Sequence, residues 1–225
     1  MCLGVPADGV GLRFEDVFPR LDPSDRKGQP PSMKRICVFC GHATGDDPVY
    51  TQAAIETGRL FAAKGIRLVY GGGNAGMMGV LANAVLREGG EVTGVIPDFL
   101  MEKELGHTGV TTLHVVKTMH ERKALMADMS DAFIALPGGF GTLDELCEIL
   151  TWAQLGLHSK PCGLLNVVGF YDPFLAHIDS AVAHGFMKPD HRRLVLDAPT
   201  IEELMPKLSA FQPINMAKWL VKEVR

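Results

Sequence analysis

The sequence lacks the features that mark membrane, secreted and nucleic-acid-binding proteins. No apolar run approaches the roughly 20 residues that a membrane-spanning helix needs, and the N-terminus has no basic segment followed by an apolar one. The formal net charge is −4, whereas proteins that bind nucleic acid broadly carry an excess of basic residues. We therefore expect a cytoplasmic protein, with neither nucleic acid nor a membrane as its partner.

Cysteine is also scarce, and the five cysteines form an odd, scattered set that is not a disulfide framework. Cys37 and Cys40 have the spacing of a redox or zinc pair, but they lie in the apolar run 36–40, which is typical of a buried strand. Residues three apart on a strand point to opposite faces of the sheet and do not converge on a metal ion. The sequence predicts small core residues here, with no metal site and no cofactor.

From residue 34 onward, apolar runs alternate with helical patterns. We predict strands at 35–40, 66–70, 91–96, 112–116, 132–136, 161–166 and 194–197, with helices near 48–64, 76–88, 119–130, 141–156, 171–184 and 200–210. Continuous apolar runs are typical of strands that are covered on both faces, and regular strand–helix alternation indicates a parallel sheet. The expected fold class is α/β, a single domain with a Rossmann-like, doubly wound parallel sheet flanked by helices.

The predicted domain spans residues 34–211, followed by a C-terminal tail at 212–225. Residues 1–33 contain five prolines and no clear periodicity, so we interpret them as an N-terminal extension, partly flexible. Ligands of such sheets bind at the carboxyl ends of the strands, which directs attention to the turn after each strand.

Two of these turns are rich in glycine. The turn 40–45 offers backbone groups and the Thr44 hydroxyl, although a plain turn is equally consistent with it. The turn 70–79 has three consecutive glycines, then Gly76 and Gly79 at the start of a helix, which allows close approach of a ligand to the backbone. It lacks both the acidic partner of a dinucleotide fingerprint and the lysine of a Walker loop. A nucleotide contact is favoured, with tight packing of glycines as the alternative.

A third turn, LPGGFGTLDEL at 136–146, leads from an apolar run into an acidic helix. Its glycines free the chain to wrap an anion, and Thr142 can cap the helix, so that backbone N–H groups point at a phosphate. We interpret Asp144 as an acid in the first turn of the helix, where its negative charge interacts favourably with the helix dipole. Glu145 lies further along, where its carboxylate can reach past the phosphate; an ordinary helix-start acid is the alternative.

Arg122 and Lys123 lie near the start of another predicted helix, where a cation gains nothing from the helix dipole. An anionic ligand or a carboxylate partner would explain them, and so would simple solvation. The loop 97–109 follows the third strand and carries Glu102, Glu104 and His107; it is a candidate lid or pocket edge, although most acids there should be solvated.

Four motifs together, PGGFGTLDE (137–145), GGGNAGMMG (71–79), MHERK (119–123) and TWAQLG (151–156), strongly resemble the Lonely Guy (LOG) family. Its members are cytokinin riboside 5′-monophosphate phosphoribohydrolases, also called lysine decarboxylase-like, and the resemblance covers about residues 34–211. It implies hydrolysis of the N-glycosidic bond of nucleoside 5′-monophosphates to free base and ribose 5-phosphate. It further implies a Rossmann-like sheet and a homodimer or a higher oligomer, with a small-molecule nucleotide as substrate.

The family pattern also assigns residues. Arg122 and Glu145 match the positions held to be catalytic. Matches to substrate-binding positions are Gly41, Gly71, Gly72, Gly73, Gly76, Glu104, Lys123, Gly138, Gly139, Phe140, Gly141, Thr142 and Thr151. The first turn departs from the pattern, because the family commonly has Cys-Gly-Ser-Ser where this chain has Cys-Gly-His-Ala at 40–43. This loss of two hydroxyls puts a hydroxyl contact there in doubt.

Cleavage of a ribosyl C–N bond develops positive charge on the sugar, which a carboxylate such as Glu145 can stabilise, and no step needs a metal or a cofactor. A non-catalytic nucleotide-binding or sensing protein is the alternative, although such a protein would not need Arg122 and Glu145 together. Literal lysine decarboxylation needs a Schiff-base lysine for pyridoxal phosphate, and Lys123 beside an arginine is a poor candidate.

Overall fold

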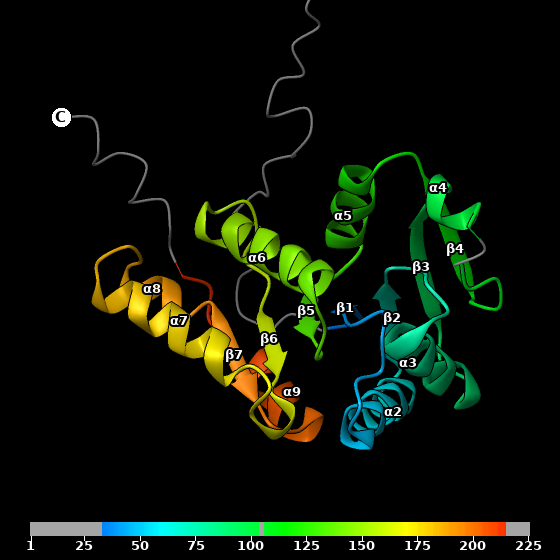
Figure 1. Ribbon diagram of the computed structural model, residues 1–225, viewed down its shortest axis with the longest axis horizontal. Helices are drawn as coiled ribbons and strands as arrows, with labels where there is room; N and C mark the ends of the chain where they lie inside the picture. Colours follow the sequence, from blue (N-terminus) through cyan, green and yellow to red (C-terminus); the bar gives the residue numbers. More distant parts are fainter. Residues whose placement is uncertain (1–32, 104–105, 215–225) are drawn as a thin grey trace, which may run out of the picture.

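The computed structural model describes residues 33–103 and 106–214. Their central element is a seven-stranded, all-parallel sheet with the strand order β4-β3-β2-β1-β5-β6-β7 (Figure 1). The strands are β1 (Arg35–Phe39), β2 (Arg67–Tyr70), β3 (Val92–Pro97), β4 (Thr112–Val116), β5 (Ala132–Ala135), β6 (Cys162–Leu165) and β7 (Val195–Ala198). The predicted single-domain parallel sheet is confirmed, with every predicted strand present.

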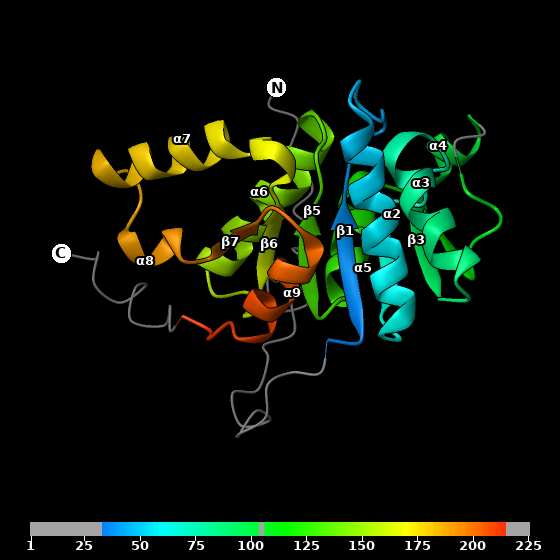
Figure 2. The same ribbon diagram turned by 90° about the horizontal axis from the view of Figure 1, so that it is seen from below.

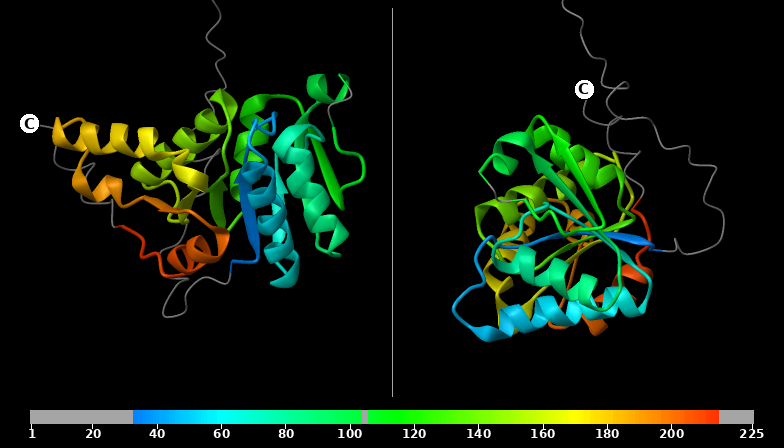
Figure 3. Two further views of the ribbon diagram at one scale, coloured as in Figure 1. Left: turned by 60° about the horizontal axis from the view of Figure 1, so that its bottom comes forward. Right: turned by 90° about the vertical axis from the view of Figure 1, so that its right-hand side faces the viewer.

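Helices cover both faces of this sheet. They are α2 (Pro48–Ala63), α3 (Gly76–Arg87), α4 (Asp98–Met101), α5 (Met119–Asp128), α6 (Phe140–Gln154), a 3-10 turn η2 (Val167–Gly169), α7 (Asp172–Ala183), α8 (Pro189–Arg192) and α9 (Ile201–Ser209). The helices α2 and α3 lie on one side of the sheet and α5 and α6 on the other (Figures 2 and 3). All six predicted helices are present; α4, η2 and α8 were not predicted.

Strand β1 shows how the sequence divides the core between the two faces. Ile36 and Val38 pack with α2, α3 and α9, whereas Cys37 and Phe39 pack with α5 and α6. Cys40 belongs to the first of these clusters and Cys37 to the second, so their thiols face opposite sides of the sheet, as predicted. Within the described residues, no group of histidine, cysteine or acidic side chains could hold a metal ion.

The strand order changes direction at β1, because the chain builds β2 to β4 on one side of β1 and β5 to β7 on the other. In such sheets the carboxyl ends of the strands at this switch point form a crevice for ligands. None of the described helices is both long and apolar enough to cross a membrane. The predicted N-terminal extension and C-terminal tail lie almost wholly outside the described residues.

Candidate active site

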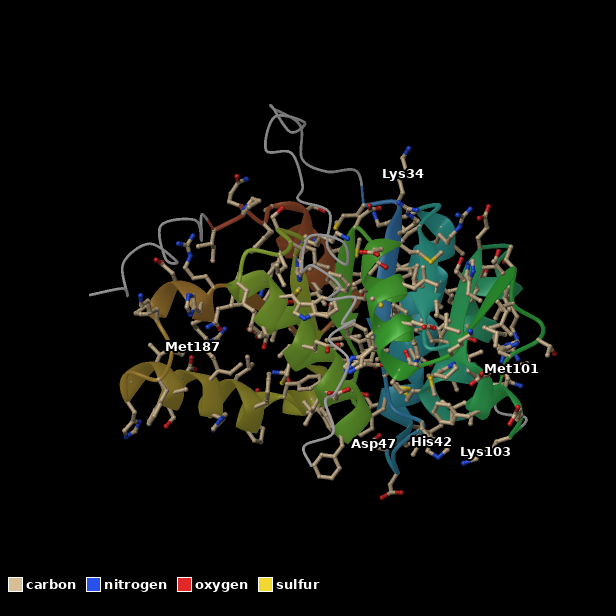
Figure 4. The ribbon with its side chains drawn as sticks, turned by 90° about the horizontal axis from the view of Figure 1, so that it is seen from above. Lys34, His42, Asp47, Met101, Lys103 and Met187 are labelled. Carbon is tan, nitrogen blue, oxygen red and sulfur yellow. The ribbon has the colours of Figure 1, made fainter. Side chains whose placement is uncertain are left out.

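A cavity of about 700 Å³ opens at this switch point. Its walls come mainly from the turns after β1, β2 and β5 and from the start of α6, with single residues of α2, α3, α4 and α5. Figure 4 shows Lys34 and His42, from the two ends of β1, at opposite edges of the sheet, with His42 on the cavity side. Ligand sites of this size and position are common in doubly wound proteins.

Backbone hydrogen bonds join the three glycine-containing turns into one wall. The Gly41 N–H donates to the Pro137 carbonyl over 3.1 Å, and the Gly41 carbonyl accepts from the Met77 N–H over 3.1 Å. Gly76 has a φ of +59°, and a Cβ atom there would stand 1.8 Å from the His42 carbonyl oxygen. Packing and backbone conformation therefore account for Gly76, which does not itself line the cavity.

The three glycines at the start of α6 differ in what surrounds them. A Cβ atom on Gly138 would stand 2.2 Å from the Thr142 hydroxyl oxygen, whereas Cβ atoms on Gly139 and Gly141 would meet nothing within 4 Å. All three line the cavity. The protein's own packing therefore explains Gly138, while Gly139 and Gly141 keep open a space that adjoins the helix start.

The predicted cap of this helix is wrong. The helix begins at Phe140, its N-cap is Gly139, and no side chain caps it, so Thr142 lies inside the first turn with its side chain buried. The first N–H groups of a helix have no intrahelical acceptor, and the helix dipole makes them attractive to anions. The uncapped start of α6 therefore offers N–H donors beside the open space at Gly139 and Gly141.

Arg122 and Glu145 meet in the cavity, with Nη2 3.1 Å from Oε1. Their side chains are only 10% and 9% exposed. The Nε–H of Arg122 donates to the Val95 carbonyl over 3.2 Å, and Nη2 approaches the Gly71 carbonyl at 3.5 Å. A Cβ atom on Gly71 would stand 1.9 Å from Nη2. Gly71 is therefore a glycine because Arg122 occupies the space of a side chain.

The surroundings of Glu145 act in opposite directions on its acidity. Burial raises the pKa of Glu145, and the guanidinium of Arg122 opposes that rise, leaving the pKa above the ordinary value of 4.5. A carboxylate in this position is poorly hydrated but is held beside a fixed cation. It is therefore available to stabilise positive charge that develops on a bound ligand.

Lys123 lies outside the lining of the cavity. Its ammonium nitrogen is 3.1 Å from Asp144 Oδ2 and 3.0 Å from Glu148 Oε2, and it does not line the cavity. The interpretation of Asp144 as a first-turn acid is also wrong, because α6 begins earlier than predicted and has no acid in its first turn. Asp144 instead binds Lys123 across the contact between α5 and α6. Carboxylate partners, one of the explanations considered, account for both cations of this pair.

The other assigned residues are distributed unevenly. Gly41, Gly71, Gly73, Gly138, Gly139, Phe140, Gly141 and Thr142 line the cavity, together with Arg122 and Glu145, while Gly72 lies behind the wall. Thr151 is exposed on α6 and donates to the Cys147 carbonyl over 2.7 Å, outside the cavity lining. Glu104 lies outside the described residues. The catalytic and substrate-binding roles of all the assigned residues, Thr151 and Glu104 included, remain predictions.

Described residues of the loop 97–109 form an edge of the site. Leu100 of α4 lines the cavity, and the His107 N–H donates to the Gly72 carbonyl over 2.8 Å. His107 itself is buried, with Nε2 3.3 Å from Asn83 Oδ1, which makes it a packing residue. Burial lowers the pKa of His107, so its imidazole is neutral near pH 7.

Several lining residues were not predicted. Tyr50 of α2 and Phe170, whose rings meet edge to face at 5.8 Å, form an aromatic wall, and Met78 and Ile96 add apolar surface. These side chains come from segments far apart in the chain and belong to no common motif. Two of them lay near a signal in the sequence: Met78 is part of the glycine-rich motif 71–79, and Ile96 lies near the carboxyl end of β3.

Comparison with known proteins gives consistent results. A protein-family model described as "Possible lysine decarboxylase" matches residues 78–208. The chain is 54% identical over 181 residues to the rice (Oryza sativa subsp. japonica) protein named cytokinin riboside 5′-monophosphate phosphoribohydrolase LOG, covering 80% of this chain and 75% of the relative. It is 52% identical over 181 residues to the Arabidopsis thaliana protein of the same name, LOG1, covering 80% and 85%.

Solved structures with the same fold are more distant. The molybdenum cofactor carrier protein of Chlamydomonas reinhardtii has a TM-score of 0.59 at 21% identity, covering 78% of this chain and 95% of that one. The molybdenum cofactor binding protein of Rippkaea orientalis has a TM-score of 0.58 at 21% identity, covering 81% and 96%. At this identity the likeness concerns the fold alone. The family model and the plant relatives carry the assignment: this chain belongs to the Lonely Guy family, which its four motifs resemble.

Proposed function

We propose that this protein hydrolyses the N-glycosidic bond of nucleoside 5′-monophosphates, either AMP or N6-modified cytokinin riboside monophosphates, to free base and ribose 5-phosphate. The observation that carries the proposal is the buried Arg122–Glu145 pair, which faces the same cavity as the uncapped start of α6. Phosphoribohydrolase relatives about 50% identical over most of the chain support this activity. Conversion of the nucleotide is thus assigned to this cavity.

The start of α6 is the place for the phosphate. Its N–H groups and the helix dipole attract an anion, and the open space at Gly139 and Gly141 lets phosphate oxygens reach the backbone. A phosphate fixed there restricts where the sugar can lie relative to Glu145, which stands about one turn further along α6. Holding reacting groups in one geometry is itself a large part of catalysis.

The reaction adds one water molecule across the bond between the sugar and the base. The water oxygen bonds to the anomeric carbon, while the bond to the base nitrogen breaks and its electron pair stays with the base. One proton of the water ends on the departing base. The ionised Glu145 stabilises the positive charge that the sugar develops in the transition state and orients the attacking water.

Arg122 serves Glu145 in this scheme. The guanidinium is fixed by the Val95 carbonyl and lies against Gly71, so it has little freedom to follow a ligand. It forms an ion pair with Glu145. We assign it to holding the carboxylate ionised and correctly aimed, with any contact to phosphate as an addition.

The direct test is a substrate panel. The purified full chain is incubated with AMP, isopentenyl-AMP, GMP, CMP and adenosine, and free base is separated by chromatography. We expect base from at least one of the two adenine nucleotides and none from adenosine, because adenosine lacks the phosphate that positions the sugar. Binding of AMP in a thermal-shift assay without release of base from either nucleotide would contradict the enzyme and favour a nucleotide sensor.

We also propose that the protein acts in the cytoplasm as a homodimer or a higher oligomer. Exposed apolar side chains on three neighbouring elements support an interface: Phe99 on α4 is 43% exposed, Val115 on β4 is 55% exposed and Met119 on α5 is 36% exposed. Exposed apolar side chains that gather on neighbouring elements often mark a protein–protein contact. Light scattering during size-exclusion chromatography tests the oligomer, and a monomer at assay concentration would contradict it.

A further inference from the structure

Two consecutive cations of α5 contact α6 in different places. Consecutive residues of a helix point about 100° apart, so Arg122 and Lys123 cannot share a direction. Arg122 enters the cavity and pairs with Glu145, whereas Lys123 passes outside the cavity to two other carboxylates of α6. The second contact is therefore built beside the first, between the same two helices.

The two carboxylates that hold Lys123 flank the predicted catalytic one in sequence. Asp144 and Glu148 are four residues apart, so they lie on one face of α6, and Glu145 lies next to Asp144. The Lys123 side chain is 11% exposed and its ammonium bridges both acids at 3.1 and 3.0 Å. An ammonium placed in this way already has two carboxylate partners and does not line the cavity in which a phosphate would bind.

The charges around Glu145 are balanced only when Lys123 is counted. The groups that act on Glu145 are the cations of α5, the acids of its own helix and two thiols of the β1 segment: Arg122, Lys123, Asp144, Glu148, Cys37 and Cys40. Burial raises the pKa of both thiols, so they stay neutral. Two cations therefore offset the two carboxylates beside Glu145, and loss of Lys123 would leave a single cation beside those two carboxylates and Glu145.

We propose that Lys123 is a positioning residue that acts on Glu145 through Asp144 and Glu148, by neutralising the acids beside Glu145, and that it is not a contact for the substrate phosphate. This inference rests on the proposed function, because Glu145 is the group through which it acts. It replaces the substrate-binding role that the family resemblance implied for Lys123.

Replacing Lys123 by methionine, which keeps the apolar stem, is expected to lower kcat by about 10- to 100-fold at neutral pH and to leave KM for AMP within about twofold. The pH profile should also move. Lys123 lowers the pKa of Glu145, so its removal raises that pKa, and the acidic limb of the rate profile shifts to higher pH. A phosphate contact would give the opposite split, with a raised KM and an unmoved limb.

Removing the two acids together with Lys123 distinguishes a positioning role of Lys123 from a phosphate-binding role. In the triple variant Lys123→Met/Asp144→Asn/Glu148→Gln, the acids that Lys123 neutralised are gone, so we expect kcat to recover most of its loss and the acidic limb to return to lower pH. If Lys123 binds phosphate, removing acids outside the cavity cannot restore KM. A triple variant that stays as impaired as Lys123→Met overturns the proposal.

Two control variants complete the design. Lys117→Met removes an exposed lysine just before α5 and should leave kcat, KM and the pH profile unchanged. Lys123→Arg keeps the charge and should retain most of the activity; a loss as deep as that of Lys123→Met would overturn the proposal. If Lys123→Met does not fold, the double variant Asp144→Asn/Glu148→Gln must move the acidic limb to lower pH, and an unmoved limb would overturn the proposal.

The activity of the wild-type protein distinguishes a failure of this inference from a failure of the proposed function. If the wild-type protein releases no base from any nucleotide, the proposed function fails and this inference fails with it. If the wild type is active and Lys123→Met changes only KM, the proposed function stands and only the positioning role of Lys123 is overturned.

Discussion

Two hollows of similar size lie at opposite edges of the sheet. The one at the carboxyl edge, about 700 Å³, contains the Arg122–Glu145 pair, whose side chains are 10% and 9% exposed. The one at the amino edge, about 760 Å³, contains the pair Arg67–Glu91, whose side chains are 45% and 54% exposed. The first pair joins the helices α5 and α6, and the second joins β2 to the residue before β3. Both hollows thus contain an arginine–glutamate pair, so size and charge type alone do not distinguish the two regions.

Burial does distinguish them. An exposed ion pair keeps most of its hydration and contributes about 0–1 kcal/mol to stability. A buried pair loses hydration on both sides, and its attraction only partly offsets that cost, so it is weak evidence for stability. Arg122 also holds a carbonyl with its Nε–H and needs a glycine beside it. At the carboxyl edge, several specific contacts therefore keep an ion pair buried although its loss of hydration costs free energy. Such an arrangement is expected for a reactive group.

Of the substitutions considered, Gly71→Ala should disturb the buried pair at the carboxyl edge most strongly. A methyl group there collides with Arg122 Nη2, so the guanidinium must leave Glu145. We expect kcat/KM for AMP to fall by about 100-fold and the free energy of unfolding to fall by about 3 kcal/mol, because Glu145 would be buried without its cation. Steady-state kinetics and urea unfolding measure both. Full activity in this variant would show that the Arg122–Glu145 contact is dispensable.

The substitution Gly141→Ala tests the other half of the site. Its methyl group meets no protein atom within 4 Å but enters the space beside the start of α6. Alanine has a higher helix propensity than glycine, so the free energy of unfolding should be unchanged or rise by about 0.5 kcal/mol, which thermal unfolding measures. Binding of AMP should weaken about tenfold, because the methyl group blocks phosphate oxygens from the backbone. Unchanged binding would place the phosphate elsewhere.

The pH dependence of kcat/KM should reflect the burial of Glu145. Burial raises the pKa of Glu145 and Arg122 lowers it only in part, so the ionised form is lost at a pH above the ordinary glutamate value of 4.5. If the ionised form is the active one, kcat/KM should fall as pH decreases through that raised pKa. A profile of kcat/KM measured from about pH 4 to 9, a range that begins near the reference pKa of glutamate and extends well above it, tests this. An acidic limb at or below 4.5 would contradict it.

The smallest effect is expected at the amino edge. Glu91→Gln removes an exposed partner of Arg67, so the free energy of unfolding should change by less than about 1 kcal/mol. Both kcat and the acidic limb should equal those of the wild type, because Glu91 lies at the opposite edge from the cavity. A marked loss of activity would show that the two edges are coupled.

Much of the fold could be predicted, because its strands are continuous apolar runs and its helices are long enough to show periodicity. The four-residue helices α4 and α8 and the three-residue η2 were missed, since such short segments have no measurable period. The start of α6 was misplaced because glycines are compatible with both a turn and a helix start. That small shift changed the interpretation of Asp144.

The site could be predicted only in part, for a similar reason. The glycine turns and the two residues Arg122 and Glu145 belong to local motifs, and the structure brings them to one cavity. The partners of Lys123 could not be found, because Asp144 lies 21 residues away and the pairing depends on how α5 packs against α6. The aromatic wall of Tyr50 and Phe170 depends in the same way on packing between distant segments.

The most direct test of the central claim, that Glu145 acts on the sugar while the start of α6 holds the phosphate, is a comparison of Glu145→Gln with the wild type. The two proteins are matched for fold by thermal unfolding, and both AMP binding and release of free base are measured. The predicted result is AMP binding within a few-fold of wild type with base release reduced by about 100- to 10,000-fold. Wild-type turnover by Glu145→Gln would contradict the assignment of this carboxylate.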